Sequence, residues 1–258
     1  MVLHRRTGIF FLLLILVTGL TTGAYVLTAT LNADEEAPPP AGGRILLLGA
    51  SVGKAWNLSE LPQRTGNDRY ALESVAYYEY DKSPALEEIL MRPKRKFRLT
   101  RTYLKGFFKP APQLPDTIIL KECAAYFPGD LPTYQALMKQ WVERLRGANI
   151  NVILATVVPV TRQDQASRPG RIESILAYND WIREYAAQER LPLLDLEAAV
   201  RIDGTDRFLR DDLAIDDGLH LNKQAYDILD QLLQKTLKAA EATQAAQVWS
   251  VTAERRLT

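Results

Sequence analysis

The sequence is poor in cysteine and histidine, two residue types on which redox and metal chemistry often depend. It holds one cysteine, Cys123, and two histidines among 258 residues. A single cysteine cannot close an internal disulfide, and one cysteine with one histidine in the body of the chain does not make a metal-binding cluster. The formal net charge of +1 favours neither nucleic acid nor another polyanion as a partner. We therefore expect no metal, no other cofactor and no nucleic-acid partner.

Residues 1–33 have the pattern of an export signal. A basic start, His4-Arg5-Arg6, precedes an apolar run over residues 9–17, and weaker apolar character continues to Leu31. This stretch is long enough to cross a bilayer. Basic residues before it and acidic residues after it place the body of the chain outside the cytoplasm. We interpret residues 1–33 as an uncleaved signal anchor in the inner membrane, with a periplasmic body; a signal peptide cleaved near Ala24 is the alternative.

Residues 34–43, rich in proline and glycine, are expected to form a linker. Residues 44–238 alternate between apolar runs typical of buried strands and longer segments of helical periodicity. This pattern predicts an α/β fold, a three-layer sandwich around a parallel sheet of about five strands. The expected strands are residues 45–48, 116–120, 151–158 and 191–196, and residues 72–80 are expected to form the second strand and its loop. The expected helices are residues 54–61, 84–91, 132–146, 172–189 and 223–247, with a loop over 161–171. Residues 239–258 would hold the end of the last helix and a tail without a pattern.

Residues 92–109 interleave eight basic residues with four aromatic ones. One interpretation is an amphipathic patch for a membrane surface or an acidic glycan. The other is a solvated helical face whose aromatic side chains pack on the body of the protein. We favour the second, because basic runs are common on protein surfaces.

Ser51 and His220 stand where a parallel sheet collects functional side chains. Ser51 follows the first strand, and His220 is the only imidazole in the body of the chain, with Asp217 three residues before it. Because the carboxyl ends of parallel strands meet at one edge, these residues can share a site. A serine hydroxyl becomes a nucleophile when a base accepts its proton, and a carboxylate stabilises the resulting imidazolium. The pattern therefore indicates nucleophilic acyl transfer.

The layout resembles that of the SGNH (GDSL-type) hydrolases over residues 44–237. The segments that carry this resemblance are Gly49-Ala50-Ser51, Pro159 after the fourth strand, Tyr178-Asn179, Leu193-Leu194-Asp195 and Asp217-Gly218-Leu219-His220-Leu221-Asn222. The resemblance implies a nucleophile at Ser51, a base at His220 and an orienting carboxylate at Asp217, with no cofactor. Asp216 is the neighbouring alternative for the carboxylate, but the family spacing selects Asp217.

The chain departs from the family pattern around the oxyanion hole. Ala50 stands where the family usually has aspartate, no glycine follows the second strand, and residues 121–125 lack the usual asparagine. The remaining candidates for oxyanion or substrate contacts are Lys82, Glu122, Cys123 and Asn57. Glu122 and Cys123 also allow a reading as a second acid and nucleophile. We instead expect a buried cysteine and a glutamate paired with a basic group.

These observations lead to the expectation of an exported serine esterase that hydrolyses an O-acyl ester on an envelope glycan or a lipid. The partners would be that ester and, through the leader, the membrane. An acyltransferase on the same scaffold is one alternative, since it shares the chemistry up to the acyl-enzyme. A non-catalytic module that binds a glycan or a protein is the other, motivated by the missing oxyanion asparagine and by Ala50.

Overall fold

The computed structural model describes residues 41–91 and 114–255, with side chains described up to residue 243. The export signal, most of the linker and the basic segment 92–109 lie outside these residues, so the interpretations given for them stay predictions. In the described part of the chain, no helix combines the length and the apolar character needed to cross a membrane.

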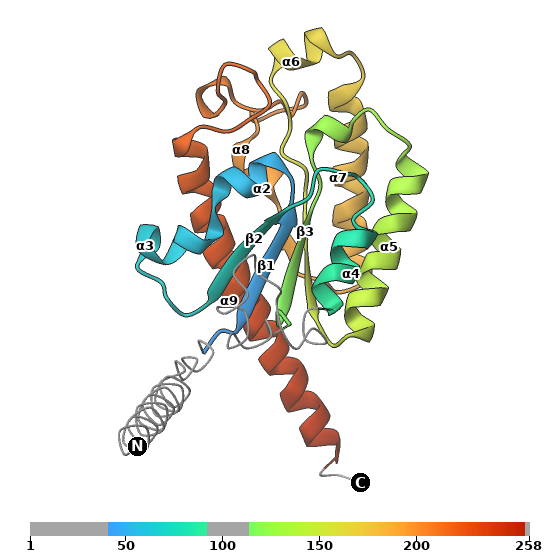
Figure 1. Ribbon diagram of the computed structural model, residues 1–258, viewed down its shortest axis with the longest axis vertical. Coiled ribbons are helices and arrows are strands. Elements are labelled where there is room, and N and C mark those ends of the chain that lie inside the picture. The colour runs from blue at the N-terminus through green and yellow to red at the C-terminus, as the bar shows by residue number, and fades with distance from the viewer. Residues whose placement is uncertain (1–40, 92–113, 256–258) are drawn as a thin grey trace, which may run out of the picture. The chain divides into compact units, whose positions relative to one another are not determined.

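Five parallel strands form one sheet in the order β2-β1-β3-β4-β5 (Figure 1). This confirms the predicted α/β fold with a central parallel sheet. The middle residues of the inner strands are apolar because helices cover both faces of the sheet. The strands are β1 (Arg44–Gly49), β2 (Ala71–Ala76), β3 (Thr117–Lys121), β4 (Asn151–Ala155) and β5 (Leu193–Leu194).

Alternate side chains of each strand point into two separate apolar cores. Leu46 and Leu48 of β1 belong to one core, and Ile45 and Leu47 belong to the other. The first core is closed by α4 (Ser83–Met91), α5 (Leu131–Gly147) and α7 (Arg171–Gln188). The second is closed mainly by α2 (Ser51–Trp56), α3 (Leu61–Thr65), α8 (Leu196–Val200) and α9 (Lys223–Arg255). The result is the predicted three-layer arrangement, with the sheet between two layers of helices.

The structure corrects several predicted boundaries. The loop expected over residues 161–171 contains the helix α6 (Arg162–Ser167), which Thr161 caps by accepting a hydrogen bond from the Asp164 N–H. The fifth strand is shorter than predicted, because the Asp195 side chain caps α8 and ends the extended backbone. The fourth strand likewise ends at Ala155 rather than at residue 158.

The two ends of the domain also differ from the prediction. The first helix starts at Ser51 itself rather than at residue 54, so the serine leads directly out of β1 into a helix. The last helix, α9, continues to Arg255 instead of ending near residue 247.

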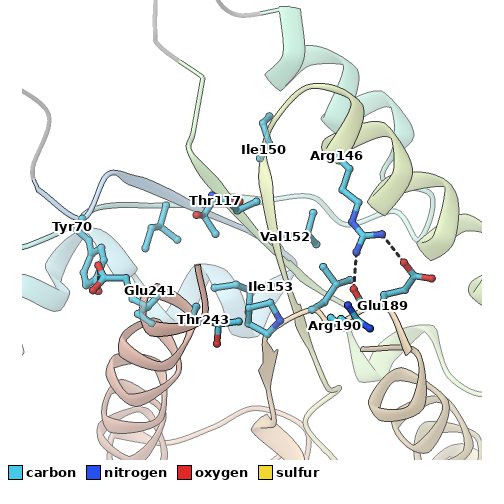
Figure 2. A pocket seen from close by; sticks show the side chains of 17 residues that line it. Tyr70, Thr117, Arg146, Ile150, Val152, Ile153, Glu189, Arg190, Glu241 and Thr243 are labelled. Atoms are coloured by element: carbon cyan, nitrogen blue, oxygen red, sulfur yellow. Dashed lines mark hydrogen bonds and ion pairs between the residues drawn. The ribbon is translucent and has the colours of Figure 1, made fainter. Parts of the chain in front are cut away.

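The amino-terminal edge of the sheet is where the chain enters β1 and β3. The Arg44 N–H donates to Asp116 Oδ2 (2.8 Å), and the Asp116 N–H donates to the Arg44 carbonyl (2.9 Å). A cavity of about 340 Å³ opens at this edge, between the starts of the strands and α9, and Thr117, Ile153 and Glu241 are among its lining residues (Figure 2). Ser51 lies at the opposite, carboxyl-terminal edge, so this cavity is separate from the site described next.

Candidate active site

Ser51, His220 and Asp217 form a hydrogen-bonded chain at the carboxyl-terminal edge of the sheet. Ser51 is the first residue of α2. The distance from His220 Nε2 to Ser51 Oγ is 2.9 Å, and that from His220 Nδ1 to Asp217 Oδ2 is 2.5 Å. The fold thus brings together two side chains that lie 169 residues apart in the sequence. This is the geometry in which an imidazole can accept a serine proton while a carboxylate stabilises the charge.

Asp217 holds both the imidazole and the backbone of its own loop. One carboxylate oxygen, Oδ2, faces the His220 ring, while Oδ1 accepts hydrogen bonds from the N–H groups of Leu219 and His220, each at 2.9 Å. Burial acts to raise the pKa of Asp217, but hydrogen bonds from the His220 ring and these two N–H groups outweigh it, so this pKa is lowered. An ionised Asp217 assigns the proton of neutral His220 to Nδ1 and leaves Nε2 as the acceptor that faces Ser51.

Neighbouring segments fix the loop that carries Asp217 and His220. Gly218 has a φ of +67°, and its carbonyl accepts a hydrogen bond from the Thr161 N–H at 2.9 Å. Asn222 donates to the Asp212 carbonyl (2.7 Å) and accepts from the Ala225 N–H (3.1 Å) at the start of α9. In the sequence, Gly218 and Asn222 were only positions of the motif that carries the family resemblance. In the structure, their hydrogen bonds hold the loop in place.

We expect Gly218→Ala to lower the rate of any acyl transfer at Ser51 far more than Gly66→Ala does, although both place an alanine at a positive φ. A Cβ at Gly218 would stand 2.2 Å from Thr161 Oγ1, so the loop must shift. A displacement of about 1 Å can cost on the order of a hundredfold in rate. Gly66→Ala is the matched control, because Gly66 has a φ of +68° and open space around its Cβ position. Both variants are compared by thermal unfolding and by turnover; equal activity of the two would show that the contact with Thr161 is unimportant.

The structure buries three of the four side chains that the sequence offered for oxyanion or substrate contacts. Lys82 Nζ and Glu122 Oε2 lie 2.6 Å apart, and both side chains are fully buried. Cys123 is a free cysteine and only 5% exposed. Asn57 caps the far end of α2, where its side chain accepts a hydrogen bond from the Ser59 hydroxyl. Position along the sheet edge was predictable for these residues, but the direction and burial of their side chains were not.

Sequence reasoning also missed a buried carboxylate between β5 and the His220 loop. Glu197 is fully buried and accepts hydrogen bonds from Arg183 (2.9 Å), Arg201 (3.3 Å) and Arg207 (2.5 Å). The Asn179 amide also donates to it at 2.8 Å. Arg201 stands four residues after Glu197, but Arg183 and Arg207 come from separate segments, so the sequence did not indicate that the three arginines meet at one carboxylate.

Among the described residues, no group of three or more histidine, cysteine, aspartate or glutamate side chains is placed to hold a metal ion.

A family model matches part of the chain. Residues 108–228 match the GDSL-like Lipase/Acylhydrolase family. The match covers less than half of the chain, and Ser51 lies outside it.

Solved structures share the fold of this chain at low sequence identity. A GDSL-like lipase from Bacteroides thetaiotaomicron is 17% identical with a TM-score of 0.56, and the match covers 84% of this chain and 98% of that one. An acetyl xylan esterase, AlAXEase, is 18% identical with a TM-score of 0.55, covering 74% and 98%. A catalytic mutant of an acetylxylan esterase from Geobacillus stearothermophilus is 11% identical with a TM-score of 0.53, covering 77% and 95%. No curated protein matches the sequence.

The family match and the hydrogen-bonded chain are separate observations. The family match concerns sequence, whereas the Ser51 and His220 contact is a property of the three-dimensional structure. The departures from the family pattern remain: Ala50 is a buried apolar residue, and the side chains after β3 are buried. Any donors to an oxyanion beside Ser51 would therefore have to come mainly from the backbone.

Proposed function

We propose that this chain is an exported serine esterase that hydrolyses an O-acyl ester through Ser51, His220 and Asp217. The observation that supports this most strongly is the continuous hydrogen-bonded chain from Asp217 through His220 to the Ser51 hydroxyl. The match of residues 108–228 to the GDSL-like Lipase/Acylhydrolase family supports the same class of reaction.

In the proposed first half-reaction, Ser51 Oγ attacks the ester carbonyl carbon while His220 Nε2 accepts the hydroxyl proton. The bond from the carbonyl carbon to the alcohol oxygen then breaks, and His220 returns the proton to the departing alcohol. In the second half, His220 takes a proton from water, which attacks the acyl-enzyme, and the carboxylic acid leaves as Ser51 regains its proton. Asp217 stays ionised and stabilises the imidazolium in both halves.

The negative charge that develops on the carbonyl oxygen needs preorganised donors. The N–H of Ser51 is one candidate, because the first N–H groups of a helix have no intrahelical acceptor. Backbone N–H groups from the loops after β2 and β3 are the others. These loops lie on either side of the Ser51 turn because β1 lies between β2 and β3 in the sheet.

For the substrate, we propose an O-acyl group, such as an acetyl group, on an envelope glycan, with a lipid ester as the alternative. Two of the structural neighbours are described as acetylxylan esterases, and this supports an acetyl ester of a glycan as the proposed substrate. The export signal expected in residues 1–33 supports an extracytoplasmic location. A sugar hydroxyl that replaces water in the second half-reaction would make the same site an acyltransferase, which an acceptor sugar in the assay would reveal as a transfer product.

The purified full-length chain is expected to react with a fluorophosphonate probe, which labels activated serines covalently. Ser51→Ala removes the nucleophile and His220→Ala removes the base, so we expect labelling to disappear in both variants. A screen of acetylated sugars and short-chain acyl esters then identifies the ester.

Ser59→Ala is the matched control for the labelling experiment, because Ser59 is an exposed serine whose hydroxyl donates to Asn57 rather than to a histidine. It should label like the wild type. A folded wild type that does not react with the probe would overturn the esterase proposal and favour the binding-module alternative.

A further inference from the structure

The two loops that flank Ser51 are joined to each other by a buried ion pair. Lys82 is the last residue of the loop between β2 and α4, and Glu122 directly follows β3. Their charged atoms lie 2.6 Å apart, and both side chains have no solvent exposure. Since β1 lies between β2 and β3, this ion pair spans the strand that carries the serine.

Further contacts connect the same two loops. The Tyr126 hydroxyl, on the loop after β3, lies 3.3 Å from the carbonyl oxygens of Tyr77 and Glu79 on the loop after β2. The Tyr77 N–H in turn donates to the carbonyl of Gly49, the last residue of β1, at 2.7 Å. The loops after β1, β2 and β3 are therefore one connected unit at the edge where Ser51 lies.

Burying the charges of Lys82 and Glu122 costs desolvation free energy, so this ion pair is not an efficient source of stability. Lys82 is fully buried, and its Nζ lies 5.2–5.7 Å from the ring centres of Tyr80, Tyr126 and Trp141. Glu122 Oε1 is buried without a hydrogen-bond partner, and burial raises the pKa of this glutamate. Apolar pairs of similar volume often stabilise a core as well as a buried ion pair does. We therefore look for the role of the ion pair in the loop geometry that it fixes rather than in stability.

We propose that Lys82 and Glu122 are positioning residues, a brace that holds the loops after β2 and β3 in the arrangement that an oxyanion hole beside Ser51 requires. This inference rests on the proposed esterase function. Neither side chain touches the reacting atoms, because both are fully buried. The brace acts through the backbone, and it accounts for a site whose loop after β3 offers Glu122 and Cys123 in place of an asparagine.

The test is the double variant K82M/E122M in the full-length chain, which replaces the ion pair with apolar side chains of similar size. We expect it to fold, with amide hydrogen exchange increased in residues 77–83 and 122–127. We also expect the rate of fluorophosphonate labelling and kcat to fall about tenfold to a hundredfold, with little change in KM, because oxyanion donors act in the transition state. The single variant K82M leaves Glu122 unpaired, and its melting temperature should fall further than that of the double variant.

Arg64→Met is the control, because it breaks the ion pair between Arg64 and Asp230 (2.7 Å) on α3 and α9 and leaves both loops untouched. It should lower the melting temperature without changing the labelling rate. Unchanged hydrogen exchange in K82M/E122M would overturn the brace, and increased exchange with wild-type kcat would overturn its role in positioning. If the wild type itself shows no labelling, the esterase proposal fails, while the exchange measurement still decides whether the ion pair orders the loops.

Discussion

Asp217→Asn is expected to lower kcat by about 10⁴-fold while leaving the fold intact. The asparagine can keep its carbonyl oxygen in the place of Oδ1, where Asp217 accepts from the N–H groups of Leu219 and His220. Its NH₂ group then faces His220 Nδ1 and donates to it. The imidazole must respond by carrying its proton on Nε2, so it can no longer accept the proton of Ser51.

Asp216→Asn is the matched control for this prediction. Asp216 is the exposed neighbour that sequence spacing alone leaves as an alternative orienting group, and the structure gives His220 Nδ1 to Asp217 instead. We expect Asp216→Asn to keep wild-type turnover and fluorophosphonate labelling. Steady-state kinetics of both variants on the same ester decide the matter: a comparable loss in both, or full activity in Asp217→Asn, would contradict the assigned roles.

Glu197→Ala should produce the largest loss of stability of any single substitution considered for this protein. The fully buried carboxylate faces Arg183, Arg201 and Arg207. Removing it leaves guanidinium groups without their central partner, and breaking a buried ion pair in this way costs about 3–5 kcal/mol of unfolding free energy. Denaturant titration monitored by fluorescence measures this loss directly.

Glu189→Ala provides the comparison, because Glu189 pairs with Arg146 at the surface, where the side chains are 38% and 41% exposed. Screened surface pairs contribute at most about 1 kcal/mol. We therefore expect a small change in Glu189→Ala. Similar losses in the two variants would mean that burial does not set the contribution of the Glu197 cluster.

The parts of this protein that the sequence predicts correctly are those with a local signal. The apolar run at β1, the helical spacing of Trp141, Val142 and Leu145 in α5, and the Asp217 to His220 motif each depend on neighbouring residues. Because the parallel strands end at one edge, the meeting of Ser51 and His220 also follows from topology.

The parts that sequence reasoning missed depend on contacts between distant segments. Lys82 and Glu122 look like polar loop residues until the fold pairs them across 40 positions and buries both. The Glu197 cluster is similar, since Arg207 meets it only through the path of the loop after α8. Helix α6 was missed because its sequence is polar throughout, so the capping contact of Thr161 rather than an apolar stripe marks its start.

Arg44 and Asp116 are hydrogen-bonded where β1 and β3 begin, and this position suits the attachment of a label or a support. The six residues of β1 separate this entry point from Ser51, which is about 20 Å of extended chain. A reporter group or a solid support attached ahead of Arg44 is thus joined to the domain on the side away from the nucleophile. Protein immobilised in this way would have Ser51 facing the solution, so that large substrates could reach it without approaching the support.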